Sequence, residues 1–422
     1  MRVAWFSPLP PVRSGISAYS LDVLEGLRRD HAIDLYVDDG VWRAAGGHLH
    51  AGRGGETVAL DGPYGLPLYR AYDFAVAHER APYDLIVYQM GNAACHRYMW
   101  PYVLRWPGLV VLHDAALHHA RAQALLLDTR ADDYRAEFRF NHPGVDPRVA
   151  DFVVAGLEGS PYYLWPMLRL VMSRARALVV HGAPLAEALA EEYPDTPIAT
   201  VAMGVPDPWV SRPATGNRQP ATGASVAMAR QAFGIVDIPD QLPVADCRLP
   251  ALNNPLPVAG CRLPESILLS AFGLITPEKR ILPILRALAA IRDEAPFVRL
   301  RLVGEVGEHY ALWQDVAETG TRDLIEVTGY VDDERLAEEL RGADVCLCLR
   351  WPTARETSAS WLRCLAAGKP TLVPDQLSTS DVPTLDPRHW LLKHDRRDAA
   401  SVFQPPDASR AVAVSIELSD EE

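Results

Sequence analysis

The 422-residue sequence contains only six cysteines, and their arrangement argues against two common kinds of site. None forms a C-x-x-C pair and no histidines follow at zinc-ligand spacing, so a disulfide framework and a structural zinc site are both disfavoured. Cys346 and Cys348 lie in an apolar run, where we expect small side chains buried on one face of a strand. This cysteine usage favours a reducing compartment.

Long apolar runs are also absent. No stretch approaches the ~18 apolar residues of a membrane-spanning helix, and the start, MRVAWFSPLPP, lacks the apolar core of a signal peptide. We therefore expect a soluble, cytoplasmic protein. The apolar segment Trp100–Trp106 either packs inside the protein or touches lipid, so peripheral contact with the inner face of the membrane stays open.

Positive charge is scarce, with 41 Lys and Arg against 54 Asp and Glu and a formal net charge of −13. Proteins that grip nucleic acid need a basic surface, so we predict no nucleic-acid partner, although a local basic site remains possible. No G-x-G-x-x-G follows the first predicted strand, which argues against a dinucleotide-dependent oxidoreductase.

Short apolar runs alternate with amphipathic helical segments, which is typical of parallel βαβ units covered on both faces. In the first half, strands are predicted at Met1–Phe6, Ala32–Val37, Leu85–Gln89, Leu109–Leu112, Ala177–Val180 and Ile198–Ala202. In the second half, they are predicted at Ile267–Gly273, Arg299–Val303, Leu324–Thr328, Val345–Leu349 and Pro370–Val373. Helices are predicted between them at Ala18–Arg29, Pro184–Glu192, Pro283–Ile291 and Glu334–Arg341. The sequence thus predicts two successive α/β halves.

Proline and glycine are dense between the halves, where a near repeat occurs. Leu242–Pro250 (LPVADCRLP) and Leu256–Pro264 (LPVAGCRLP) match at eight of nine positions with a period of 14 residues. Two copies are too few for a solenoid, so we interpret the segment as a proline-stiffened insertion. The predicted organisation is an N-terminal domain over 1–205, an insertion over 206–265 and a C-terminal domain over 266–422.

Two candidate sites follow strands of the first half. Gly15, after Ser14, opens a predicted helix whose free N–H groups suit a phosphate, although such a glycine is also ordinary loop chemistry. His113 and Asp114 follow Leu109–Leu112, at the edge where open α/β sheets bind ligands. A histidine satisfied at a strand end is the alternative. We expect no metal site from the adjacent pair His118 and His119, which point to different faces and suit a structural or surface role.

Two more candidates follow strands of the second half. Lys279 and Arg280 precede a predicted helix, where two cations suit a diphosphate leaving group, unless they are simply a solvated pair. Glu356, Thr357 and Ser358 lie in the loop before another helix and offer acceptors for sugar hydroxyls and donors for a phosphate. Alternatively, Glu356 only interacts with the helix dipole while Thr357 or Ser358 caps a helix that ends before Gly368.

The chain resembles glycosyltransferase family 4, the group 1 glycosyltransferases of GT-B fold. The resemblance rests on SPLPPVRSGISAYS (Ser7–Ser20), YQMGN and PGLVVLHD (around Tyr88–His113), FGLITPEKR (Phe272–Arg280), VTGYV (Val327–Val331) and PTARETSAS to LAAGKP (Pro352–Pro370). It implies two Rossmann-like parallel-sheet domains facing across a cleft, with the acceptor held chiefly by the first and a nucleotide-sugar donor chiefly by the second.

The resemblance also implies a reaction and a set of residues. The expected reaction is transfer of a sugar from a nucleotide-diphosphate sugar to a glycan, lipid or polysaccharide acceptor, retaining the anomeric configuration without any cofactor or required metal. Glu356 and His113 would be catalytic, with His113 at the transferred sugar. Asp114 and Asn92 would lie on the acceptor side. The implied donor-binding residues are Gly15, Lys279, Arg280, Thr357, Ser358, Gly329 and Tyr330.

Two departures from the family leave other functions open. Arg363 occupies the position of the glutamate that usually binds the ribose hydroxyls, and the chain stops at Glu422, soon after a predicted strand at Ala411–Ile416. The usual terminal helices are missing, so the C-terminal domain is expected to be truncated. A non-catalytic or degenerate member that binds a nucleotide or scaffolds a partner is therefore the main alternative, ahead of a GT-B epimerase or phosphorylase.

Overall fold

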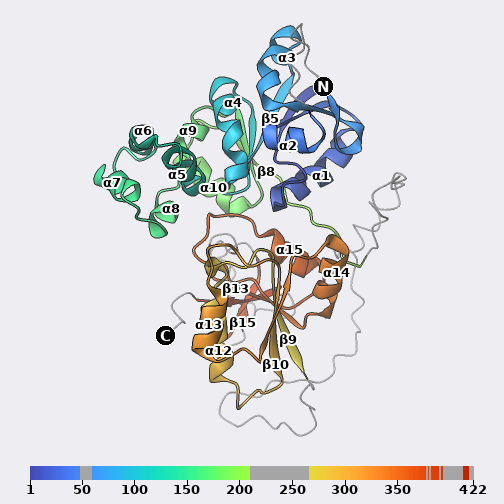
Figure 1. The fold of residues 1–422 in the computed structure, drawn as a ribbon, viewed down its shortest axis with the longest axis vertical. Helices are drawn as coiled ribbons and strands as arrows, with labels where there is room; N and C mark the ends of the chain where they lie inside the picture. The colour runs from blue at the N-terminus through green and yellow to red at the C-terminus, as the bar shows by residue number, and fades with distance from the viewer. Residues whose placement is uncertain are drawn as a thin grey trace, which may run out of the picture.

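Two eight-stranded sheets dominate the computed structural model (Figure 1). It describes residues 1–47, 59–209, 266–376, 379, 382–388, 391–392 and 412–417. We call residues 1–209 the N-terminal lobe and residues 266–417 the C-terminal lobe. The predicted insertion over 206–265 lies outside the described residues from position 210 onward, and so does its near repeat.

The first sheet has the strand order β3-β4-β2-β1-β5-β6-β7-β8, and all neighbours are parallel except β3 and β4. Its central strand, β1, is apolar from Val3 to Phe6 because it is covered on both faces. Ala4 and Phe6 pack into one core and Val3 and Trp5 into the other. The strands are β1 (Arg2–Phe6), β2 (Ala32–Val37), β3 (Leu60–Asp61), β4 (Pro67–Arg70), β5 (Leu85–Met90), β6 (Leu109–Leu112), β7 (Ala177–Val180) and β8 (Ile198–Thr200).

Helices cover both faces of this sheet. One face packs against α1 (Gly15–Leu27) and α2 (Asp39–Ala44). The other packs against α3 (Phe74–Arg80), α4 (Trp100–Arg105), α9 (Arg169–Met172) and α10 (Ala183–Glu192). Trp100 is buried and Trp106 half-buried in that core, so these two side chains pack inside the lobe.

A small helical unit that the sequence pattern did not predict lies between β6 and β7 and projects to one side of the sheet (Figure 1). It consists of α5 (His118–Leu126), α6 (Ala131–Asn141), α7 (Arg148–Val154) and α8 (Ser160–Leu164). His118 is buried inside it, with Nε2 2.6 Å from the Tyr134 hydroxyl and Nδ1 3.1 Å from the Pro161 carbonyl. Its role is therefore structural, one of the two roles predicted for it.

The second sheet has the order β11-β10-β9-β12-β13-β16-β14-β15. Its strands are β9 (Ile267–Phe272), β10 (Val298–Val303), β11 (Ile325–Gly329), β12 (Val345–Leu347), β13 (Thr371–Pro374), β14 (Thr384–Asp386), β15 (Leu391–Leu392) and β16 (Ala413–Ile416). One face packs against α12 (Ile281–Ala290) and α13 (Leu312–Thr319), and the other against α14 (Asp333–Gly342) and α15 (Ala359–Ala366). Cys346 is buried in the second core as predicted, whereas Cys348 is half-buried beyond the strand end.

Several predicted element boundaries differ from the observed ones by one to three residues. Helix α1 begins at Gly15, the residue predicted to open it, and not at Ala18, because Ser14 caps it, its hydroxyl accepting a hydrogen bond from the Ser17 N–H at 3.0 Å. Strand β12 ends at Leu347 instead of Leu349. The chain then turns toward the loop after β9, where the Trp351 N–H donates to the Glu278 carbonyl at 2.7 Å.

Gly304, directly after β10, is where the backbones of two loops meet most closely. Its φ is +151°, and a Cβ there would lie 2.1 Å from the Gly273 carbonyl oxygen. We expect Gly304→Ala to lower the free energy of unfolding by about 1–3 kcal/mol, because backbone cannot yield as a side chain does. Urea denaturation checks this, with Gly342→Ala as the control, since a Cβ at Gly342 meets no atom within 4 Å. Equal stability of the two variants would contradict it.

Candidate active site between the two lobes

Both sheets reverse their strand order near the middle, between β1 and β5 and between β9 and β12. Open α/β sheets bind ligands outside the carboxyl ends of the strands at such points. In the N-terminal lobe, the loops there carry Gly15, Asn92 and the His113–Asp114 pair. In the C-terminal lobe, they carry the Lys279–Arg280 pair and the 348–358 loop. All four predicted segments therefore lie at a ligand-binding edge.

The two edges face each other and touch (Figure 1). The Ala115 N–H donates to the Ala354 carbonyl at 2.7 Å. The Arg13 guanidinium lies over the Tyr330 ring, 4.4 Å from its centroid, next to Gly329 at the end of β11. Residues of the loops before α1 and after β6 thus contact residues of the C-terminal lobe across a shared interface.

Asp114 and Asn92, the predicted acceptor-side residues, are joined directly. An Asp114 carboxylate oxygen accepts the Asn92 N–H at 2.6 Å, and the Asn92 side chain accepts the Ala120 N–H at 2.9 Å at the start of α5. Burial raises the pKa of Asp114 to about 6, and the Glu356 carboxylate acts in the same direction. The Asn92 hydrogen bond and the Arg350 guanidinium act against this rise.

His113 has both ring nitrogens engaged inside the N-terminal lobe. Nε2 lies 2.7 Å from the Gln89 side-chain oxygen, Nδ1 lies 3.2 Å from His181 Nε2, and His181 Nδ1 lies 2.9 Å from the Val201 carbonyl. Burial lowers the pKa of both histidines, so both are neutral near pH 7.

The tautomers follow from the Val201 carbonyl, which can only accept. Neutral His181 donates to it from Nδ1 and accepts from His113 Nδ1–H, so His113 Nε2 must accept from the Gln89 amide. With the amide in this orientation, Gln89 Nε2, a buried atom otherwise without a hydrogen-bond partner, donates to His113. The His113 ring therefore presents no free nitrogen to the cleft, and its hydrogen bonds anchor the loop that carries Asp114.

Lys279 and Arg280 lie between β9 and α12, at the predicted place. The ammonium of the half-buried Lys279 donates to the Phe272 carbonyl at the end of β9, at 2.5 Å. Burial lowers the pKa of Lys279 to about 8, helped by the positive charge of Arg350. Arg280 is the residue before α12 and has a left-handed backbone, with φ at 59°.

Glu356 lies two residues before the cap of α15, with only 13% of its side chain exposed. One carboxylate oxygen is 3.1 Å from the Arg350 guanidinium, and the other accepts the Thr353 hydroxyl at 2.5 Å. Ser358 caps the helix through the Trp361 N–H at 3.2 Å, which settles the open choice between Thr357 and Ser358. Gly368 follows the helix with φ at +66°, as its predicted position requires.

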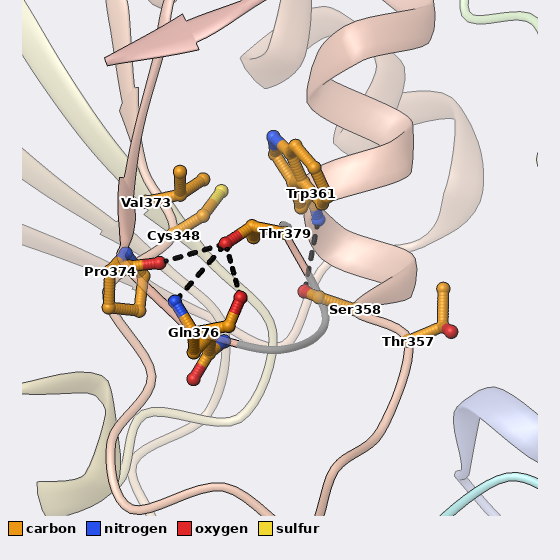
Figure 2. Close-up of a pocket in the computed structure, with 8 residues that line it drawn as sticks. All are labelled: Cys348, Thr357, Ser358, Trp361, Val373, Pro374, Gln376 and Thr379. Atoms are coloured by element: carbon orange, nitrogen blue, oxygen red, sulfur yellow. Dashed lines mark hydrogen bonds between the residues drawn. The ribbon is translucent and has the colours of Figure 1, made fainter. Parts of the chain in front are cut away.

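A small open pocket lies beside the start of α15 (Figure 2). Figure 2 shows the bonded pair Ser358 and Trp361 on one side and Cys348 and Val373, from the strand ends, on the other. Thr357 lies at the rim toward the N-terminal lobe, where its hydroxyl is 3.9 Å from the point that a Cβ atom would occupy at Gly182. The pocket therefore opens beside the contact between the lobes.

Sequence reasoning gave no role to several residues of this site. Arg350 could have been noticed as a cation in the same loop as Glu356, but Gln89 and His181 show their role only through contacts between strands. Tyr163, on α8, reaches the Glu278 carboxylate of the other lobe; burial, with that carboxylate's charge, raises the pKa of Tyr163 to about 12. No sequence signal pointed to it, because the helical unit was not predicted.

Arg363 makes its ion pair within the C-terminal lobe. Arg363 pairs with Asp333 of α14 at 3.4 Å. Within the described ranges, no three or more His, Cys, Asp or Glu side chains are grouped so as to hold a metal ion. In the same part of the chain, every helix is too short or too polar to cross a membrane.

Comparisons with known proteins bear on the fold and on the C-terminal lobe. Residues 266–400 match the family model described as "Glycosyl transferases group 1". A search of curated proteins found no match. Sucrose-phosphate synthase from Thermosynechococcus elongatus is similar in structure, with a TM-score of 0.50 at 14% sequence identity over 89% of this chain and 81% of that one.

Two further solved structures are similar at lower scores. One is WaaG, a glycosyltransferase involved in lipopolysaccharide biosynthesis, with a TM-score of 0.49, 14% identity and coverage of 88% of this chain and 81% of that one. The other is HepE from Anabaena in complex with UDP and glucose, with a TM-score of 0.47, 13% identity and coverage of 90% of this chain and 82% of that one. The likeness to sucrose-phosphate synthase confirms the predicted GT-B fold of two parallel-sheet α/β domains. The narrower assignment to family 4 stays a prediction.

Proposed function

We propose that this protein is a glycosyltransferase that moves a sugar from a nucleotide-diphosphate sugar to a glycan, lipid or polysaccharide acceptor, with retention of configuration. The observation that supports this proposal most directly is the contact between the edges of the two sheets at which ligands are expected to bind. This contact places Glu356 within electrostatic reach of Asp114 across the interface. The group 1 glycosyltransferase match supports it, because it covers the lobe that would bind the donor.

The C-terminal lobe supplies what loss of a nucleoside diphosphate requires. Glycosyl transfer passes through an oxocarbenium-like transition state, in which negative charge grows on the departing phosphate. The start of α12, with Lys279 and Arg280 beside it, offers fixed positive charge at the strand edge. The Glu356 carboxylate would accept hydroxyl groups of the transferred sugar, and Tyr330, 58% exposed, would lie near the base.

The N-terminal lobe would orient the acceptor. The Asp114 carboxylate faces the C-terminal lobe and would accept a hydrogen bond from the acceptor hydroxyl, while Asn92 holds that carboxylate in place. His113 would fix the loop through its ring bonds to Gln89 and His181. In a retaining reaction, the departing phosphate itself would take the proton of the acceptor hydroxyl, so no separate base is assigned.

Thermal denaturation with UDP, GDP, ADP and NAD at matched concentrations tests the proposal. A ligand at 100 times its Kd stabilises the native protein by about 2.7 kcal/mol, so we expect one nucleoside diphosphate to raise the Tm clearly while NAD does not. Incubation with nucleotide sugars of the same base should then release the diphosphate. A cooperative melt that no nucleoside diphosphate shifts would overturn the proposal.

The same experiment distinguishes the proposed transferase from the main alternative, a non-catalytic member. A nucleoside diphosphate that binds without any transfer to a panel of glycan and lipid acceptors would favour a non-catalytic member, as the loss of the usual glutamate at Arg363 suggests. The anomeric configuration of the product, read by NMR coupling constants, tests retention independently. Cytoplasmic location, with or without contact with the membrane face, remains part of the proposal.

A further inference from the structure

Arg350 places a guanidinium in the cleft among carboxylates of both lobes. It follows β12, the strand at the switch point of the second sheet, and bonds Glu356 at 3.1 Å. Burial acts to lower the pKa of Arg350, but the negative charges of Glu356, Asp114 and Glu278 outweigh burial and raise it. Arg350 is therefore a permanent cation that faces more than one anionic partner.

The ionisable groups around Arg350 include more carboxylates than cations. Three carboxylates (Asp114, Glu278 and Glu356) interact with Arg350, and Lys279 repels it. The Lys279 ammonium already donates to the Phe272 carbonyl. The Arg350 side chain keeps 41% of its surface exposed and uses one nitrogen on Glu356. A guanidinium carries five N–H donors in a planar fork that matches phosphate oxygens, so donors remain for a second anion.

The Glu356 carboxylate already has hydrogen-bond partners within the protein. Both of its oxygens are engaged, by Arg350 and by the Thr353 hydroxyl. The backbone on either side of Arg350 is held elsewhere: before it, the Cys348 N–H donates to the Leu372 carbonyl, and after it, the Trp351 N–H donates to the Glu278 carbonyl. Any exchange of partners by Arg350 is therefore a movement of its long side chain, not of the loop.

We propose that Arg350 binds the diphosphate of the donor and, in doing so, leaves Glu356 free to accept the hydroxyl groups of the transferred sugar. This inference rests on the proposed function and adds a residue to it. The diphosphate carries more negative charge than one carboxylate and can accept both arms of the guanidinium fork, so it competes with Glu356 for Arg350. Donor binding thereby prepares the carboxylate that acts on the sugar.

Calorimetric titration of Arg350→Met tests this, since methionine keeps much of the apolar stem and removes the charge. The probes are the nucleoside diphosphate that stabilises the wild type and the corresponding nucleoside. We expect the affinity for the diphosphate to fall at least tenfold and that for the nucleoside to stay within twofold. Arg350→Lys should recover part of the loss. Arg322→Met is the control, because Arg322 lies over the Trp313 ring in the C-terminal lobe, away from this cluster.

Each other outcome is decisive. Equal diphosphate affinity in wild type and Arg350→Met would overturn the inference and leave the proposed function standing. Parallel losses for diphosphate and nucleoside, with a lower Tm, would show that Arg350 only supports the fold. Failure of the wild type to bind any nucleoside diphosphate would overturn the proposed function itself, before Arg350 is considered.

Discussion

Glu356→Ala is expected to lower kcat/KM for sugar transfer by about 10²-fold or more, with a Tm close to that of the wild type. A hydrogen bond to a charged group contributes about 1.5–3 kcal/mol, and a group that acts on developing charge in a transition state contributes about 10²–10³ in rate. The fold should persist because Glu356 lies in a loop before α15 and the Ser358 cap remains.

Binding of the nucleoside diphosphate should change in the opposite direction. Removing Glu356 frees the Arg350 guanidinium, which stays close to Asp114 and Glu278 and becomes more available to phosphate. We therefore expect equal or tighter diphosphate binding in the variant that no longer transfers sugar. Glu338→Ala, on the exposed side of α14, is the matched control and should behave as wild type. Wild-type turnover in Glu356→Ala would remove the assigned role.

The central strands of both sheets could be predicted from sequence because a strand buried on both faces reads as a short apolar run, whereas β3, β4, β14 and β15, at or beside the sheet edges, were not predicted. Leu109–Leu112 and Ala177–Val180 match β6 and β7 residue for residue. The loops with Gly15, Asp114 and Glu356 could be predicted for a related reason. The carboxyl ends of parallel strands share one edge, so polar residues after consecutive strands fall together without any knowledge of packing.

Features that depend on contacts across the fold were out of reach. The ring of His113 is fixed by Gln89 on β5 and His181 just after β7, which lie 24 and 68 positions away in the sequence. A local pattern after Leu112 looks the same whether that ring faces the cleft or the interior. Helices α5 to α8 were missed for a different reason: they bury their apolar residues in a core of their own, away from the sheet.

The stability of the protein should depend on the charge of Asp114. Burial raises its pKa from 3.8 to about 6, so the protonated form is favoured in the native state. Its contribution to stability is fully present below pH ~4 and is lost as the pH rises through ~6. At pH 8, Asp114→Asn should therefore raise the free energy of unfolding by about 1–3 kcal/mol, and the gain should vanish at pH ~4. Asp30→Asn, at an exposed position, is the control for denaturation at both pH values.

The same carboxylate should set the acid limb of the activity profile. If the anion of Asp114 receives the acceptor hydroxyl, kcat/KM falls about tenfold per pH unit below pH ~6, and Asp114→Asn gives a low, flat profile. Cys95 and His96, on the neighbouring segment, do not titrate there, since burial raises the pKa of the thiol to about 11 and lowers that of the imidazole to about 4. An acid limb that survives in Asp114→Asn would assign it to another group.

The pH at which this acid limb lies provides a second test, because two neighbours shift the pKa of Asp114 in opposite directions. The Glu356 carboxylate raises the pKa of Asp114 and the Arg350 guanidinium lowers it. Residual transfer by Glu356→Gln should therefore show the limb at lower pH, and Arg350→Met should show it at higher pH, each measured at saturating donor. Shifts in one common direction, or none, would mean that the carboxylates and the guanidinium do not share one cleft in the working protein. Opposite shifts would show that Glu356 and Arg350 of the C-terminal lobe lie close to Asp114 of the N-terminal lobe in the working protein.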